Sequence, residues 1–169
     1  MKEYVIYTDG ACSTNPGPGG YGVILVADGQ RRELSGGFRK TTNNRMELFS
    51  VITALRALPA PGCKVTIFSD AQYVVRMYSG GYAQRWRKDG WTRNKGKEPA
   101  LNPDLWGDLL DLCGQHEVEF IWVRGHAEHP ENTRCDELAV AARQVANLPV
   151  DEGYEKPAPS KPAAQLTLF

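Results

Sequence analysis

The sequence has no net charge, no cysteine framework and no long apolar run. Lysine and arginine together number 20, as do aspartate and glutamate, so the whole-chain charge indicates neither an acidic nor a basic partner. The four cysteines include no C-x-x-C pair, which argues against a zinc ribbon or a disulfide framework and favours a reducing, cytoplasmic environment. No basic N-terminal region precedes an apolar stretch, and no segment approaches the roughly 20 residues that cross a membrane. We therefore expect neither export nor membrane insertion.

The chain is long enough for one domain with a sizeable core. Its 169 residues contain no internal repeat, but their character changes after residue 147, where Pro157, Pro159 and Pro162 stand among small and charged residues. The last five residues, QLTLF, are apolar again. We predict a folded domain over residues 1–147, a Pro-rich flexible linker over 148–164 and a separate motif at 165–169.

Runs of β-favouring residues alternate with helical patterns along the chain. Asp28 and Gly29 form a strong two-residue hairpin signal, and Met46, Ile52 and Leu55 recur at helical spacing. Caps are expected among residues 41–44, at Asn102, and at Asn132 or Thr133. The predicted strands cover 4–9, 21–27, 31–39, 64–69 and 118–123, and the predicted helices cover 45–58, 71–78, 103–113 and 133–146.

The order of these segments predicts the fold class. The first three strands should form an antiparallel meander, whereas a helix before each later strand allows parallel pairing. We therefore predict an α/β fold with a five-stranded mixed sheet, three strands antiparallel and two parallel, and helices on both faces.

Four acidic residues occupy unusual positions in this pattern. Asp9 and Asp70 each end an apolar strand, and neighbouring parallel strands would bring them to the same sheet edge. Glu47 and Asp136 lie near helix starts, where a solvated or capping acid is the ordinary interpretation. Carboxylates that converge repel one another, and hard divalent cations with oxygen ligands relieve that repulsion. The pattern predicts a metal site, and two ions about 3.5–4 Å apart would suit phosphodiester cleavage.

Four motifs in order make a specific resemblance. They are YTDGACSTNPGPGGYG at residues 7–22, TTNNRMEL at 41–48, SDAQYV at 69–74 and VRGHAEHPENTRCDELA at 123–139. Over residues 4–142 the chain resembles type 1 ribonuclease H, the bacterial ribonuclease HI. The resemblance implies the ribonuclease H-like fold.

The same resemblance implies an Mg²⁺-dependent endoribonuclease that cleaves the RNA strand of RNA–DNA hybrids. Two metal ions, for which Mn²⁺ can substitute, would be held by Asp9, Glu47, Asp70 and Asp136. Hydrolysis would leave 3′-hydroxyl and 5′-phosphate ends, and the cellular role would be the removal of primers and R-loops by a cytoplasmic monomer.

His126 lies in a loop without apolar periodicity, where a histidine is ordinarily solvated. The resemblance implies a role in proton transfer or product release, which suits a group that titrates near neutrality. Zinc binding by His126, His129 and Cys135 is an alternative, but their spacing matches no standard zinc pattern.

A basic and aromatic segment indicates nucleic acid. Six basic residues and one acidic residue lie between Arg85 and Lys97, and Trp86 and Trp91 interleave with them. A charge run is ordinarily only a solvated face, but this one resembles the protrusion that grips the DNA strand in the family. The residues expected there are Tyr82, Trp86, Arg87, Lys88 and Trp106.

The resemblance also implies the rest of the hybrid-binding surface. A 2′-hydroxyl distinguishes RNA from DNA, so one part of the surface should face the RNA. Asn43 and Asn44 could instead cap a helix, or one of them could do both. By motif, the hybrid would contact Gly10, Ala11, Cys12, Asn15, Asn43, Asn44 and Gln72, and a DNA phosphate would contact Thr42 and Asn102.

The last residues resemble the pentapeptide by which bacterial replication and repair proteins dock on the sliding clamp. An extended peptide could insert apolar side chains in a pocket while the glutamine makes polar contacts. A tail that folds back on its own domain, or chance, is the alternative. The residues concerned are Gln165, Leu166, Leu168 and Phe169.

Two other functions compete with this interpretation. One is a different nuclease of the same fold, such as a junction resolvase or a transposase-like domain, and the other is a non-catalytic hybrid-binding module. TTNNRMEL and the basic aromatic segment favour hybrids over the first. The presence of all four acids argues against the second, because a module that only binds has no need of them.

Overall fold

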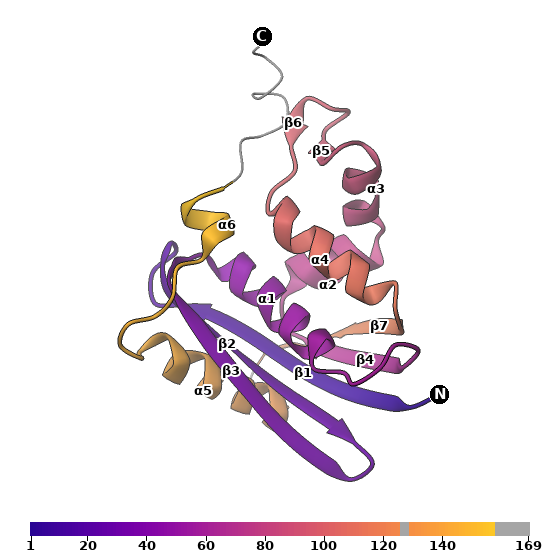
Figure 1. Ribbon diagram of the computed structural model, residues 1–169, viewed down its shortest axis with the longest axis vertical. Helices are drawn as coiled ribbons and strands as arrows, with labels where there is room; N and C mark the ends of the chain where they lie inside the picture. The colour runs from indigo at the N-terminus through magenta and orange to yellow at the C-terminus, as the bar shows by residue number, and fades with distance from the viewer. Residues whose placement is uncertain (126–128, 158–169) are drawn as a thin grey trace.

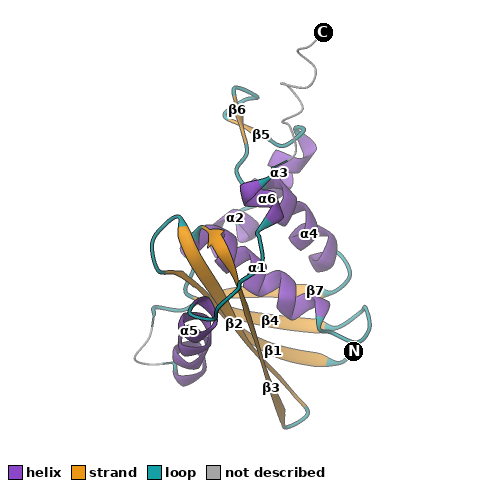
Figure 2. Cartoon of the chain, turned by 60° about the vertical axis from the view of Figure 1, so that its left-hand side comes forward, coloured by secondary structure: helices purple, strands orange, loops and turns teal. Residues whose placement is uncertain are grey.

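The computed structural model describes residues 1–125 and 129–157, which form a mixed sheet with helices on both faces (Figures 1 and 2). The sheet has five strands in the order β3-β2-β1-β4-β7. Its strands are β1 Glu3–Cys12, β2 Gly17–Ala27, β3 Gln30–Thr41, β4 Lys64–Ser69 and β7 Glu117–Trp122, and a separate ribbon pairs β5 Thr92–Arg93 with β6 Glu98–Pro99. The helices are α1 Asn43–Arg56, α2 Gln72–Ser79, α3 Tyr82–Lys88, α4 Pro103–Cys113, α5 Pro130–Arg143 and α6 Glu152–Glu155.

The predicted sheet is confirmed in its pairing. Strands β1, β2 and β3 are antiparallel neighbours, whereas β4 pairs parallel with both β1 and β7. Asp28 and Gly29 both have positive φ, at 52° and 75°, as the tight turn between β2 and β3 requires. The predicted α/β class with three antiparallel and two parallel strands is therefore correct.

The main core lies between the sheet and the α1 and α4 layer. Ile6 and Ile67 point from neighbouring strands toward Leu48 and Ile52 of α1, and all four side chains are fully buried. Trp106 of α4 closes the same core with no exposed surface. Figure 2 shows α5 on the other side of the sheet, away from this layer.

Strand β2 begins earlier than the predicted residue 21, because the glycine-rich stretch before it is part of the sheet. A Cβ on Gly20 would lie 2.1 Å from the Ala139 carbonyl oxygen, and one on Gly22 would lie 2.3 Å from that of Cys135. The α5 backbone can approach the sheet this closely only because these residues lack side chains. The glycines that the sequence pattern assigned to a turn therefore form the surface on which α5 packs.

Two predicted helix caps differ in the structure. Helix α5 begins at Pro130 after His129, so Asn132 lies inside the first turn, where its buried Nδ2 donates to the Phe68 carbonyl oxygen at 3.3 Å. Asn102 does precede α4, but it has a left-handed backbone with φ of 55° and its side chain does not cap the helix. Tertiary contacts use these two amides instead.

The chain after residue 147 differs from the expected flexible linker as far as residue 157. The Arg39 amide donates to the Pro149 carbonyl oxygen at 2.9 Å, and the Arg39 guanidinium pairs with Glu155 at 2.9 Å. Asp151 is buried and pairs with Arg45. Residues 148–156 therefore pack on the domain, because their acids pair with arginines of β3 and α1. We call this segment the C-terminal strap. None of the helices in the described residues has the length and apolar character to cross a bilayer.

Candidate active site

Three elements bring the predicted acids together at one end of the sheet. Thr8 of β1 is paired with Ser69 of β4 in parallel register. Asp9 and Asp70, which follow these two residues, therefore lie side by side at the same end of the sheet. Glu47 reaches the same place from the first half of α1. One ligand oxygen from each of Asp9, Glu47 and Asp70 lies within 4.8 Å of the other two.

Gly10 is what allows α1 to approach β1 so closely. A Cβ on this residue would lie 2.5 Å from the Met46 carbonyl carbon and 2.6 Å from the Glu47 amide nitrogen. The Gly10 amide donates to Asp9 Oδ1 at 2.9 Å and also to Glu47 Oε1. One backbone N–H therefore lies between the two carboxylates and helps to hold both.

The electrostatics of the cluster are unfavourable to full ionisation. Burial raises the pKa of Asp9 to about 7, and the charges of Asp70 and Asp136 add to the increase. Burial also raises the pKa of Glu47 well above its ordinary value, and repulsion from Asp9 adds to it. The two carboxyl groups share a hydrogen bond, so without a cation a proton between them is the favoured arrangement.

Asp136 of α5 faces the same cavity but does not belong to the compact trio. The cavity has a volume of about 360 Å³ and is lined by acids, by backbone of residues 10 and 11 and by polar side chains. Asp136 is partly exposed, unlike the buried Asp9 and Glu47. The four acids predicted from the sequence thus line one cavity; its walls are Asp9, Gly10, Ala11, Asn43, Asn44, Glu47, Asp70, Ala71, Gln72, Tyr73 and Asp136.

The donor set fits a hard divalent cation. Carboxylate oxygens are the ligands that Mg²⁺ and Mn²⁺ prefer, and the charges of the clustered acids repel one another. A bound cation would reverse the pKa increases of Asp9 and Glu47, because it stabilises their ionised forms. Asp9, Glu47 and Asp70 would hold such an ion, and Asp136 could contribute from the cavity wall.

The residues predicted to contact a hybrid through the RNA strand form one surface beside the acids. The Cys12 amide donates to Asn43 Oδ1 at 2.8 Å, and the Asn43 amide donates to Asn15 Oδ1 at 3.1 Å. Asn43, Asn44 and Gln72 are exposed. The helix cap is Thr42, whose hydroxyl oxygen accepts from the Arg45 amide at 3.2 Å, so neither Asn43 nor Asn44 has to serve as the cap.

The basic aromatic segment forms α3 and the β5–β6 ribbon, which project beside α4 in Figure 1. Arg87 pairs with Asp111 of α4 at 2.6 Å and Arg93 pairs with Glu98 at 3.2 Å, so part of the positive charge is already offset. Tyr82 is 46% exposed and lies under the Arg85 guanidinium at 4.8 Å. Lys88 is exposed on the same helix.

Trp106 differs from its predicted role on the binding surface, because its side chain has no exposed surface. Its Nε1 donates to the Tyr73 hydroxyl at 2.8 Å, and its ring packs edge-on against Trp86 at 6.2 Å between centroids. An apolar α4 face needs a large core side chain at this position. Trp106 thus supports Tyr73, which lines the acidic cavity, and does not face a ligand.

The zinc alternative loses one of its three ligands. Cys135 is fully buried and its thiol donates to the Tyr7 carbonyl oxygen at 3.3 Å. Burial also raises the pKa of this thiol, which disfavours the thiolate that zinc requires. His126 and the motif at residues 165–169 lie outside the described residues.

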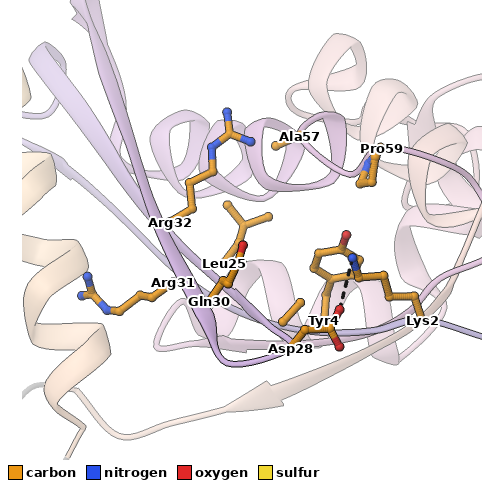
Figure 3. Close-up of a pocket in the computed structure, with 10 residues that line it drawn as sticks. Lys2, Tyr4, Leu25, Asp28, Gln30, Arg31, Arg32, Ala57 and Pro59 are labelled. Atoms are coloured by element: carbon orange, nitrogen blue, oxygen red, sulfur yellow. Dashed lines mark ion pairs between the residues drawn. The ribbon is translucent and has the colours of Figure 1, made fainter.

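Some residues of the site escaped sequence reasoning. Ala71 and Tyr73 line the cavity beside the expected Gln72, and Arg45 is buried at the start of α1. Only Arg45 had a signal, since it lies three and seven residues before Leu48 and Ile52 and so shares the apolar face of the helix. A second cavity, of about 430 Å³, lies at the opposite end of β1, where Lys2 pairs with Asp28 at 3.3 Å (Figure 3).

The fold and the site together define an α/β protein with a carboxylate cluster at the carboxyl ends of parallel strands, the type of centre that binds divalent metal ions. Comparison with known proteins then identifies it more closely. The RNase H family model matches residues 1–144, and the chain belongs to the RNase H family.

Individual relatives agree with this assignment. The chain is 60% identical over 151 residues to a ribonuclease H of Desulforamulus reducens, covering 89% of this chain and 94% of that protein. It is 55% identical over 156 residues to the ribonuclease HI of a Synechocystis species, covering 92% and 96%.

Solved structures show the same fold. LC9-RNase H1, described as a type 1 RNase H with the type 2 active-site motif, superposes with a TM-score of 0.73 and 33% identity over 85% of this chain and 72% of that one. LC11-RNase H1, solved in complex with an RNA/DNA hybrid, has a TM-score of 0.62 and 27% identity over 82% and 95%.

Proposed function

We propose that this protein is an endoribonuclease that cleaves the RNA strand of RNA–DNA hybrids with two Mg²⁺ ions, for which Mn²⁺ can substitute. The observation that carries the proposal is the convergence of Asp9, Glu47 and Asp70 within 4.8 Å in a cavity that Asp136 also lines. The relatives support the substrate, since they are ribonucleases H and one of them, LC11-RNase H1, was solved with a hybrid. The products would carry 3′-hydroxyl and 5′-phosphate ends.

The protein's own residues would position the reacting groups. Bound divalent ions supply the charge that activates water and stabilises the leaving oxygen. Asp9 and Glu47, held by the Gly10 amide, are rigid ligands, whereas the more exposed Asp70 and Asp136 are reached from solvent. His126 would carry a proton or assist product release, as the family resemblance implies.

The hybrid would lie across the polar surface beside the acids. Asn15, Asn43, Asn44 and Gln72, with Cys12 and the backbone of Gly10 and Ala11, would contact the strand that bears 2′-hydroxyls. Asn43 is already linked by hydrogen bonds to Asn15 and to the Cys12 backbone, which would order this surface before a ligand arrives.

The DNA strand would be gripped at two places. Thr42 and Asn102 would contact one phosphate, and α3 with the β5–β6 ribbon would lie along the backbone through Tyr82, Trp86 and Lys88. Arg87 would join them only by sharing or leaving Asp111.

We also propose that residues 165–169 dock on a replication sliding clamp, and that the monomer acts in the cytoplasm on primers and R-loops. Deletion of Gln165 to Phe169 should abolish binding to the purified clamp while hybrid cleavage stays at the wild-type rate. Clamp binding by the truncated chain would contradict this role for the tail.

The central proposal is tested with labelled hybrid, double-stranded RNA and double-stranded DNA, each with and without Mg²⁺. Cleavage confined to the RNA strand of the hybrid, dependent on Mg²⁺, is expected. Asp70→Asn should remove cleavage while the circular dichroism spectrum stays native, because an amide is a poor ligand for a hard cation. Normal cleavage by this variant, or wild-type cleavage of another substrate in preference to the hybrid, would overturn the proposal.

A further inference from the structure

Arg45 is a buried cation in which every guanidinium N–H has an acceptor. Its side chain is 3% exposed, although it lies between the exposed Asn44 and the acidic Glu47 on α1. Nε and Nη2 donate to the two Asp151 oxygens at 2.7 and 2.9 Å, and Nη1 and Nη2 donate to the two Asp104 oxygens at 2.9 and 2.7 Å. The fifth N–H, on Nη1, donates to Asn102 Oδ1 at 3.3 Å.

These acceptors come from separate parts of the chain. Asp151 belongs to the C-terminal strap and also accepts from the Thr41 hydroxyl at 2.7 Å, while Asn102 and Asp104 flank the start of α4. The packing has no spare room: a Cβ on Gly153 would lie 1.9 Å from Asp104 Oδ2 and 2.6 Å from Arg45 Nη2. The strap therefore fixes the guanidinium, and the guanidinium joins α1 to α4.

The contact with Asn102 has a consequence for its amide. A guanidinium offers only donors, so the Asn102 oxygen must face Arg45 and its NH₂ group must point elsewhere. The Thr42 oxygen likewise accepts from the Arg45 amide, which leaves the hydroxyl proton free to donate outward. Both residues proposed to contact the DNA phosphate can thus donate outward, Asn102 because of the Arg45 guanidinium and Thr42 because of the backbone amide of the same residue.

We propose that Arg45, locked by Asp151 of the C-terminal strap, is a positioning residue that aims the Asn102 amide at a phosphate of the DNA strand. This inference rests on the proposed function. Asp151 would then belong to the substrate-binding apparatus without touching the substrate, because it holds the guanidinium that orients Asn102.

Electrostatics alone and the positioning role predict opposite effects on hybrid binding when the Asp151 charge is removed. One guanidinium and two carboxylates carry a net charge of −1, which repels a phosphate. Loss of the Asp151 charge alone would therefore tighten hybrid binding. Loss of positioning would weaken it, because the guanidinium would shift toward Asp104 and release Asn102. A purely structural role would lower the melting temperature and leave KM unchanged.

The experiment measures kcat, KM and melting temperature for Asp151→Asn, Asn102→Ala and the double variant, with Mg²⁺ and a labelled hybrid. Asn102→Ala should raise KM about tenfold and change kcat less than twofold, since it removes a hydrogen bond to a charged group. Asp151→Asn should raise KM about threefold, and the double variant should be no worse than Asn102→Ala. Glu155→Gln, the matched control, removes another ion pair of the strap and should keep the wild-type KM.

A second readout locates the contact. A single neutral methylphosphonate is moved along the DNA strand, and wild-type KM should rise when it replaces the phosphate at Asn102. Asp151→Asn and Asn102→Ala should lose this sensitivity at that position and retain it elsewhere, whereas Glu155→Gln should behave as wild type. If Asp151→Asn unfolds at the assay temperature, Thr41→Val is used instead, because it removes only the hydroxyl bond to Asp151. This variant should show a smaller loss of methylphosphonate sensitivity at the same phosphate.

The outcomes distinguish failure of the proposed function from failure of the positioning role. Failure of the wild-type protein to cleave the hybrid would overturn the proposed function and this inference with it. Normal cleavage, combined with an unchanged or lower KM in Asp151→Asn or additive effects in the double variant, would overturn the positioning role alone.

Discussion

Asp9 shows how a residue proposed to hold a metal ion can be costly for stability. Its carboxylate is 6% exposed and stands beside three other acids, so folding raises its pKa above the value near 3.8 that it has in an unfolded chain. A carboxyl group of this kind stabilises the fold only while it is protonated. Without metal, the folded state should therefore lose stability as the pH rises from about 4 toward about 7.

Asp9→Asn should remove this penalty. In EDTA at pH 7 the variant should be more stable than wild type by up to about 4 kcal/mol, because the pKa increase from 3.8 to about 7 corresponds to about 1.4 kcal/mol per pKa unit. Near pH 4 the two proteins should differ little, since Asp9 is then protonated in the folded wild type. Urea denaturation at both pH values measures the difference. Equal stabilities at pH 7 would show that ionisation of Asp9 does not destabilise the folded state.

Metal should reverse the order of stability. In the proposed site Mg²⁺ would bind the ionised trio only in the folded state, so it should raise the melting temperature of wild type but barely change that of Asp9→Asn. Sodium chloride at the same ionic strength is the control for a general charge effect. If millimolar Mg²⁺ left the melting temperature of the wild type unchanged, the proposed metal site would be contradicted.

At the scale of elements, α5 depends on the glycines of β2. Gly20→Ala would place a methyl group 2.1 Å from the Ala139 carbonyl oxygen, so the helix would have to move outward. We expect a loss of about 1–3 kcal/mol in the free energy of unfolding, typical of overpacking, and reduced hybrid cleavage, because α5 carries Asp136. Gly114→Ala is the control: its φ is −66° and the nearest atom is at 3.4 Å, so stability should hardly change.

Helix α3 should bind DNA less through Arg87 than its charge alone suggests. Lys88→Glu should raise KM about fivefold and reduce the salt dependence of KM, because it reverses a cation that has no ion pair among the described residues. Arg87→Glu should do less to the salt dependence, since Arg87 already pairs with Asp111 at 2.6 Å. Asp111→Asn would free Arg87 and should lower KM. KM measured from 50 to 200 mM salt compares the three, and identical slopes for all would contradict a role for α3 in binding.

At the scale of the whole molecule, the folded unit extends past the predicted boundary at residue 147. A chain ending at residue 157 keeps Asp151 and should be as stable as the full chain. One ending at residue 147 leaves the buried Arg45 with Asp104 as its single carboxylate partner among the described residues, and should lose about 3 kcal/mol. Thermal denaturation of the two truncated chains decides between them, and equal melting temperatures would place the strap outside the cooperative unit.

Much of this protein could be predicted from its sequence. Alternation and turn signals located all five sheet strands, and a helix before each later strand gave the parallel pairing. The strand ends placed Asp9 and Asp70 together, because the carboxyl ends of parallel neighbours meet at one edge. The motifs supplied Glu47, Asp136 and the substrate, which the spacing of residues could not have supplied.

What the tertiary structure alone decided concerns contacts between distant residues. Trp106 became core, Asn102 turned from cap to acceptor, and Asp151 met Arg45, 106 residues away. No local pattern contains such pairs, because propensity and periodicity act over a few residues, whereas a buried charge chooses its partner by packing across the fold. The sequence by itself determined the five-stranded sheet, the helices α1, α2, α4 and α5, and the position of the acids, but not α3 or α6. The fold decided which polar side chains face water and which hold the site in place, because that depends on the surface each element covers.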